Sequence, residues 1–225
     1  MRLRETPSTQ DELHRLAEEG APAGTAVVAE SQVAGRGSRG RTWVSAPGGL
    51  WLSVLWRGPA GMAQLLSIRA GLAIASVLDG LGGLPPVRLK WPNDVIIDDA
   101  KVGGILCEGR WGPANGWVAV GVGLNVTNPL PSDARFRPAS LAQWRPDLDA
   151  AALAAPVAAV LGRLPATPTL SQEELDAWRA RDWLAGRLLR APVTGRISGV
   201  NSAGRLLVDN ESGRLEIVAS DGIEI

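Results

Sequence analysis

The chain has 225 residues, enough to bury a full core in one domain with a small appendage. Lysine plus arginine equals aspartate plus glutamate at 23 each, so no overall field would recruit DNA or an anionic membrane. The single cysteine, Cys107, cannot form an internal disulfide and lies in an apolar run, which favours a buried thiol in a reducing cytoplasm. No apolar signal segment opens the chain, and no stretch resembles a membrane span.

The first helix is expected to begin at Ser8, where Asp11 three residues later resembles a capping arrangement, and to end at Gly20. A long buried helix is expected over 62–81, because its apolar residues recur at helical spacing. Asp98-Asp99-Ala100 has the chemistry of a hairpin tip. The strands expected around these elements lie at 25–30, 51–56, 87–91, 95–97, 102–108 and 120–126.

The second half begins with a proline-bearing connection over 129–146, followed by expected helices at 151–164 and 171–184 that cover one face of the sheet. Strands with segregated helices predict an α+β fold with a mixed or antiparallel sheet. From Gly186 the pattern changes to short strands between turns, which predicts a small β module packed on the first domain. We therefore expect two domains, 1–185 and 186–225.

The segment 35–43 has the sequence Gly-Arg-Gly-Ser-Arg-Gly-Arg-Thr-Trp. Glycines permit positive φ angles and close approach to a ligand, while arginine offers a fork of donors that matches carboxylate or phosphate. Such a loop suits the binding of a polyanion. Taken alone, it is equally well explained as a solvated basic loop.

Two further segments carry candidate ligand-binding residues. Lys101 enters a strand just after the expected hairpin tip and is followed by Gly103-Gly104, an arrangement that can hold an anionic oxygen. An exposed hairpin lysine is the alternative. The segment 120–126 is a strand that ends in glycines and in Asn125, whose side chain could face a ligand.

Together these segments resemble the biotin protein ligase family, with its G-R-G-R-x-G-R-x-W loop, K-W-P-N-D strand end, K-x-x-G-I-L strand and G-x-G-x-N turn. All four motifs occur here in that order, and Ser8-Thr9-Gln10 is similar to the family's S-T-N. The resemblance covers residues 5–128 closely. It implies a class II synthetase-like catalytic domain and a C-terminal SH3-like β-barrel. Since seven residues precede Ser8, the helix-turn-helix of the family's DNA-binding members is not expected, nor is a repressor role.

The resemblance implies an ATP-dependent ligase that converts biotin to biotinyl-5′-AMP and then transfers biotin to a lysine of a biotin carboxyl carrier protein. Lys101 and Arg36 are its implied catalytic residues, with Mg²⁺ bridging the phosphates of ATP. The implied biotin-binding residues are Ser8, Thr9, Gln10, Gln32, Gly35, Arg36, Gly37, Ser38, Lys101, Gly103 and Gly104. The implied ATP- and adenylate-binding residues are Arg36, Arg39, Arg41, Trp43, Asn93, Asp94, Lys101 and Asn125.

For some residues the sequence leaves the role or the position open. Ser38 stands where the family usually has arginine, so the loop supplies one cation fewer. Trp43 could stack on the ligand or anchor the loop, whereas Trp91 is expected in the core. His14 is expected to be a solvated helix residue, and no cluster of His and Cys suited to bind a metal occurs.

Other functional classes stay open beside the ligase. A lipoate or octanoate ligase shares the chemistry, but its R-R-x-x-G-G pattern is absent. A non-enzymatic phosphate-binding module would explain the arginine loop but not Lys101 with its glycines. Homodimers often form in the family through sheet edges, and the sequence does not decide this point. We expect no DNA or membrane partner and a cytoplasmic location.

Overall fold

The computed structural model describes residues 1–59, 61–111, 116–132 and 136–218. They form a seven-stranded sheet of order β1-β2-β3-β7-β6-β5-β4 and a four-stranded sheet of order β11-β10-β9-β8. The strands of the large sheet are β1 (Arg2–Thr6), β2 (Ala26–Gln32), β3 (Leu50–Arg57), β4 (Arg88–Lys90), β5 (Asp94–Ile97), β6 (Ala100–Trp111) and β7 (Gly116–Leu124). The helices are α1 (Thr9–Glu18), α2 (Ala63–Gly80), α3 (Ala150–Leu161) and α4 (Gln172–Arg181). The small sheet contains β8 (Leu188–Leu189), β9 (Gly195–Val200), β10 (Leu206–Asn210) and β11 (Gly213–Ile217).

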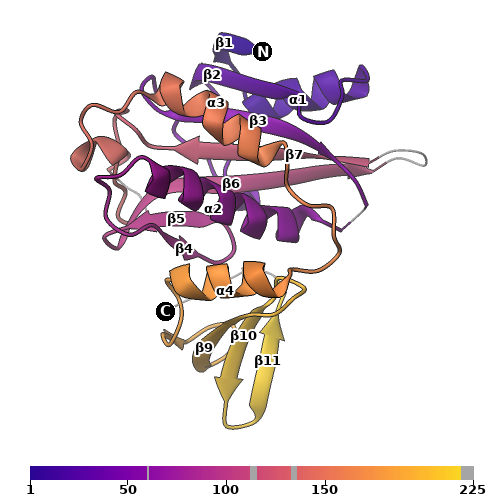
Figure 1. Cartoon of the computed structure of the whole chain (residues 1–225), viewed down its shortest axis with the longest axis vertical. Coiled ribbons are helices and arrows are strands. Elements are labelled where there is room, and N and C mark those ends of the chain that lie inside the picture. Colours follow the sequence, from indigo (N-terminus) through magenta and orange to yellow (C-terminus); the bar gives the residue numbers. More distant parts are fainter. Residues whose placement is uncertain (60, 112–115, 133–135, 219–225) are drawn as a thin grey trace.

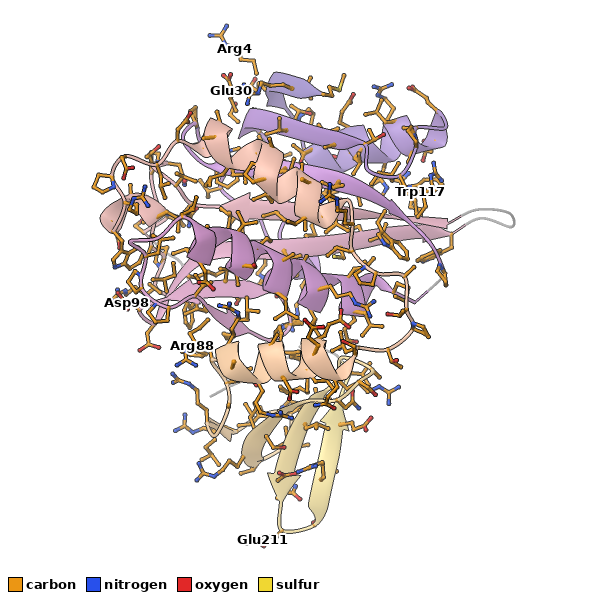
Figure 2. The ribbon with its side chains drawn as sticks, viewed as in Figure 1. Arg4, Glu30, Arg88, Asp98, Trp117 and Glu211 are labelled. Carbon is orange, nitrogen blue, oxygen red and sulfur yellow. The ribbon has the colours of Figure 1, made fainter. Side chains whose placement is uncertain are left out.

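The large sheet is mixed, because β1 pairs parallel to β2 while the other neighbours pair antiparallel. The β5–β6 hairpin turns at Asp98 and Asp99, whose φ angles of 46° and 55° are those of a type I′ turn. Figure 2 shows Asp98 at one end of the large sheet and Trp117 at the opposite end. The hairpin thus returns the chain into β6 with Lys101 as its second residue.

Helices cover both faces of the large sheet. In Figure 1, α2 and α3 cross in front of it, and alternate residues of β3 such as Leu52 and Val54 pack with them in the main core. On the other face α1 packs through Leu13 and Ala17 against Val27 and Leu55, which form a second, smaller core. The sheet therefore offers one fully apolar face and one face that α1 covers only in part.

Helix α2 is long and apolar enough to pass as a membrane span by length and composition. The same helix packs along the large sheet, and more than half of its residues are buried within the protein. Its buried Arg69 donates hydrogen bonds to Glu174, to Thr167 and to the carbonyl of Thr169. These contacts identify α2 as a core helix.

The small sheet docks on the large domain beside α4, which lies between the two sheets in Figure 1. The carbonyl of Gly204 accepts hydrogen bonds from Trp91 Nε1 (2.9 Å) and Gln64 Nε2 (2.7 Å). The amide of Trp183 donates to Leu89 O at 2.9 Å, so the segment after α4 is tied to the β4 edge. The apolar residues of β9 and β10 join the main core, as expected for a module that cannot stand alone.

The expected elements are present, but two helices end early and one strand was not anticipated. The helices expected at 151–164 and 171–184 end earlier, at Leu161 and Arg181. Strand β1 was not anticipated, because its sequence is polar and mostly exposed at the sheet edge. The expected core position of Trp91 is confirmed, since it is 1% exposed. The boundary between 185 and 186 stays a prediction.

The expectation that His14 is solvated is wrong. Its side chain is buried between α1 and the sheet, and its Nδ1 accepts a hydrogen bond from Trp117 Nε1 at 3.0 Å. Burial, followed by the nearby charges of Arg110 and Arg36, lowers the pKa of His14 to about 4. The polar neighbours along the chain suggested exposure, but they point away from the sheet on the other side of α1.

This histidine should make the fold sensitive to acid. Because the pKa of His14 is about 4 in the folded chain and ordinarily 6.5, the unfolded chain binds the proton more readily between these values. Stability is then fully present above pH 6.5 and should fall by about 2 kcal/mol from pH 7 to pH 5 on this account alone. His14→Gln, which keeps an acceptor for Trp117 but does not titrate, should lose correspondingly less in urea unfolding. Equal losses in both proteins would contradict this assignment.

Candidate active site

A cavity of about 1260 Å³ opens on the face of the large sheet opposite α2 and α3. It is lined by the start of α1, the segment 36–44, the strands β4 to β7 and the segment 183–190. Every residue that the sequence predicted for biotin or nucleotide binding lines this cavity except Gly35 and Gly103. The fold thus brings together residues from four distant parts of the chain.

Gly35 and Gly103 have packing reasons to be glycine. A Cβ at Gly103 would collide with Leu124 on the apolar face of the sheet, whereas Gly104 faces the cavity. Adjacent strand residues point to opposite faces, so the two glycines cannot both line one site. A Cβ at Gly35 would collide with the carbonyl of Trp43 and with Ser45.

Glycines on the cavity face let side chains lie close to the sheet. A Cβ at Gly121 would meet the amide of Gln10, and one at Gly123 would meet the indole of Trp43. Gly104 also approaches the Trp43 ring. The glycines of the G-x-G turn are therefore required by neighbouring protein side chains, since both lie on the same face of β7.

One end of the cavity is polar and uncharged. Gln32 Oε1 accepts from the amide and the hydroxyl of Thr9 at 2.8 and 3.2 Å, and Gln32 Nε2 donates to Ser45 Oγ at 2.8 Å. The hydroxyls of Thr9 and Ser53 are 2.8 Å apart. This network fixes the orientation of the Gln32 amide. Ser8 caps α1, because its hydroxyl accepts from the amide of Gln10 at 3.3 Å.

Gln10 presents an acceptor at this end. Its Nε2 donates to the carbonyl of Leu106 at 2.8 Å, which fixes the side-chain amide. Its Oε1 is then buried with no hydrogen-bond partner among the described residues. A buried acceptor of this kind is costly unless a ligand donor meets it.

The other end of the cavity is cationic. Asp94 pairs with the ammonium group of Lys101 and with that of Lys90 at 3.2 Å. Burial alone would raise the pKa of Asp94, but Lys101 and then Lys90 outweigh it and hold this pKa below its usual value. Within the described wall, Asp94 is the only carboxylate among seven lysines and arginines. In a chain of zero net charge, this excess marks a site for a polyanionic ligand.

The arginine loop has a defined backbone shape. Trp43 N donates to Gly35 O at 2.9 Å, and Gly37 N donates to Arg41 O at 2.8 Å, so the loop closes as a small hairpin. Of its three glycines, Gly40 has a positive φ of 68°, and Arg39 before it has a φ of 65°. These two hydrogen bonds set the shape of the loop backbone.

The arginines of this loop have protein partners. Arg36 forms ion pairs with Asp11 at 2.9 Å and Glu108 at 2.8 Å. Arg41 donates to the hydroxyl of Ser38 at 2.8 Å and to its carbonyl at 3.1 Å. Ser38, where the resembling family usually has arginine, thus orients the guanidinium of Arg41.

Trp43 lies between the loop and the sheet. Lys101 Nζ is 5.2 Å from the centre of its ring, and its buried Nε1 lacks a partner among the described residues. The indole therefore anchors the loop on Gly104 and Gly123. The contacts of this residue are those of a loop anchor, and stacking on a ligand stays a prediction.

Asn93 and Asn125 are held at the ends of their strands. Asn93 Nδ2 donates to Ile105 O at 2.7 Å, and Asn125 Nδ2 donates to Ala139 O at 3.2 Å. Asn125 Oδ1 accepts from Asn128 Nδ2 at 3.2 Å. Their amides thus brace the cavity wall.

Cys107 packs against the main core from β6. Burial, followed by the charge of Glu108, raises the pKa of its thiol to about 12. The thiol stays protonated at neutral pH and is no nucleophile.

The sequence missed several residues of the cavity. Ser53 was hidden in an apolar strand, and Lys90 was passed over although it belongs to the quoted K-W-P-N-D motif. Phe136, Trp183 and Arg187 enter from segments whose proximity only the fold reveals. Among the described residues, no group of three or more His, Cys, Asp or Glu side chains is arranged to bind a metal.

Comparisons with known proteins agree with this architecture. Residues 3–125 match the model of the biotin/lipoate A/B protein ligase family. The chain is 46% identical over 110 residues to the bifunctional ligase/repressor BirA of Escherichia coli, covering 46% of this chain and 33% of that protein. It is 44% identical over 130 residues to the biotin–acetyl-CoA-carboxylase ligase of Paracoccus denitrificans, covering 55% and 53%. These alignments span about a third to a half of the relatives' lengths.

The structural comparison extends over the whole chain. A biotin protein ligase from Aquifex aeolicus, solved in complex with biotin and ATP, superposes with a TM-score of 0.82 at 28% identity, covering 98% of this chain and 96% of that one. The expected fold, a mixed sheet flanked by helices with a small C-terminal β module, is thereby confirmed. The chain belongs to the biotin/lipoate A/B protein ligase family.

The shared carboxylate generates a prediction about stability. Asp94→Asn should leave two half-buried ammonium groups without their counter-charge, lowering the free energy of unfolding at pH 7 on the order of 3 kcal/mol. Asp147→Asn removes a carboxylate paired with Arg145 at the surface and should change stability far less. Chemical denaturation gives the free energy of unfolding of both variants. Equal losses would mean that the pairing of Asp94 with two lysines stabilises the fold no more than a surface ion pair does.

Proposed function

We propose that this protein is an ATP-dependent biotin protein ligase. The observation that carries the proposal is the division of one cavity into an uncharged polar end around Gln10 and Gln32 and a cationic end around Lys101. Biotin suits the first end through its ureido ring, and the phosphates of ATP suit the second. Relatives that are named biotin ligases support the same reading.

The reaction would proceed in two steps. A carboxylate oxygen of biotin forms a bond to the α-phosphorus of ATP, the bond from that phosphorus to the bridging oxygen breaks, and pyrophosphate leaves. The amine of a carrier lysine then attacks the activated carbonyl, loses a proton and displaces AMP. In the first step two anions must meet, so cations that screen their repulsion and stabilise the transition state contribute most to the rate.

Lys101 is the residue best placed for this role. Its ammonium group lies at the cationic end, held by Asp94 and over the ring of Trp43. Lys90 supplies a second ammonium on the same carboxylate. Arg36 would join them by exchanging its pairs with Asp11 and Glu108 for ligand oxygens, which are stronger partners than exposed side chains.

Magnesium belongs to this proposal as part of the nucleotide. The carboxylate of Asp94 in the described cavity wall is already shared by two lysines, so these residues do not fit a resident metal site. Mg²⁺ commonly binds through substrate phosphates and few protein ligands, and here it would arrive with ATP.

The protein partner is proposed as the biotin carboxyl carrier protein of a biotin-dependent carboxylase.

A cytoplasmic location accords with the lone, unreactive Cys107. Pairing of two copies through β1, the edge strand of the large sheet that the segment after α4 does not cover, is also proposed. Size-exclusion chromatography at several concentrations tests this last point.

A lipoate or octanoate ligase is the second candidate, because the family includes such enzymes. The buried acceptor of Gln10 favours a ligand with an N–H group, which the ureido ring of biotin has and a fatty acyl chain lacks. Pyrophosphate release from ATP with biotin, lipoate or octanoate as the added acid separates the candidates. Release with biotin alone is the expected result, and release with none of the acids would refute adenylation.

Lys101→Met should lower the rate of biotin-dependent pyrophosphate release by about 10²- to 10³-fold, because it removes a cation from the transition state. Arg110→Gln is the matched control: it lies on the same strand and removes the same charge, but pairs with Glu18 at the surface. Circular dichroism should show both variants folded. A folded Lys101→Met protein with near-normal activity would exclude this residue from the chemistry.

The loop at 35–43 should respond to ligand. Its backbone hairpin is exposed and small, so its amides should exchange readily in the free protein, and anions bridging its arginines should order it. Hydrogen exchange with and without biotin and ATP measures the change. The same protection in both states would show that the loop is already in its working conformation.

A further inference from the structure

The segment that follows α4 contributes a cation to the cavity. Arg187 and Trp183 line it together with Lys90 and Phe136. The guanidinium of Arg187 lies 3.7 Å from the centre of the Trp183 ring, and Arg187 Nε donates to the carbonyl of Trp183 at 2.8 Å. The stacking and the hydrogen bond from Nε together fix the direction in which the two terminal nitrogens of Arg187 point.

These residues continue as a row toward Asp94. The rings of Trp183 and Phe136 meet edge to face, with centres 5.3 Å apart and planes at 81°. On the far side, Lys90 Nζ lies 5.6 Å from the centre of the Phe136 ring and pairs with Asp94. We call Lys90, Phe136, Trp183 and Arg187 the cation–aromatic row. It joins the C-terminal segment to the cationic end of the cavity.

The charge of Arg187 is only weakly compensated. Its ion pair with Asp99 is long, at 3.5 Å, and the side chain of Asp99 is 74% exposed. Exposed pairs of this length neutralise little charge, because water and salt screen them. Asp99 is further engaged by the indole Nε1 of Trp183, which holds the stacking platform in place.

From this geometry we infer that Arg187, oriented by Trp183, is a nucleotide-binding residue of the proposed ligase and contacts the phosphates of ATP. The inference rests on the proposed function for the identity of the nucleotide. Arg187 binds the anion directly, while Trp183 is a positioning residue. Docking of the small sheet would then complete the nucleotide end of the cavity, which the family match over residues 3–125 does not contain.

The test compares Arg187→Gln and Arg187→Lys with wild type. Loss of a partly exposed charged contact should raise the KM for ATP and its equilibrium dissociation constant about 5- to 20-fold, with the KM for biotin within about 2-fold. Arg187→Lys should recover part of the effect, because it keeps the charge but loses the stacked fork. Arg179→Gln is the control, since Arg179 pairs with Asp176 on the exposed face of α4.

Two measurements keep the outcomes separate. Biotin-dependent pyrophosphate release gives the two KM values, and calorimetric titration with a non-hydrolysable ATP analogue gives nucleotide affinity without any reaction. Unchanged ATP affinity in Arg187→Gln, or an equal rise of both KM values with a lower melting temperature, would overturn the inference. A wild type that binds the analogue but releases no pyrophosphate would refute the ligase proposal, while the titration would still decide the role of Arg187.

Discussion

The carboxylate of Asp94 is the contact on which the cationic end of the cavity depends. It lies at the start of β5, pairs in register with Lys90 of β4, and contacts Lys101 of β6, the strand on the other side of β5. Three neighbouring strands thereby bring two ammonium groups to one largely buried carboxylate. Without this anion the lysines would repel each other in a site that excludes much of the water, so Asp94 sets both their separation and their direction.

The sheet contributes to the site through glycines, which place no side chain on the cavity face. Gly104, Gly121 and Gly123 lie on the cavity face of β6 and β7, while their neighbours fill the apolar core behind. This arrangement lets one sheet be a packed core on one side and a shallow floor on the other. The indole of Trp43 and the amide of Gln10 lie directly on this floor, and Gln10 Oε1 has no partner among the described residues. Glycine on the cavity face thus leaves room for a ligand, while the apolar side chains on the other face still form the core.

Most of the site could be predicted from short motifs, because each motif places several cavity residues within a few positions of one another in the sequence. These motifs lie at or near strand ends, and the sheet brings those ends together. The errors have physical causes. Gly103 and Gly104 cannot share a face, a rule of strand alternation that could have been applied to the sequence. His14 was misjudged because burial depends on which side of α1 meets the sheet.

Contacts between residues far apart in the chain could not be predicted from the sequence. The pairing of Arg36 with Asp11 and Glu108 joins three separate elements, and no local pattern shows it. Arg187 enters the cavity only because the segment after α4 is tied to Leu89 and the small sheet to Trp91. These contacts depend on tertiary packing, so a residue more than eighty positions from Lys101 becomes its neighbour in the same cavity.

Lysine occurs in this chain only at positions 90 and 101, and both ammonium groups are held by Asp94; all other basic side chains except His14 are arginines. An acyl-adenylate acylates amines but not guanidinium groups, which stay protonated. The amine of Met1 donates to the carbonyl of Ala26 at 2.7 Å. A ligase with this composition would have an outer surface nearly inert to its own activated intermediate. The lysines that such an intermediate could acylate would belong almost entirely to other proteins.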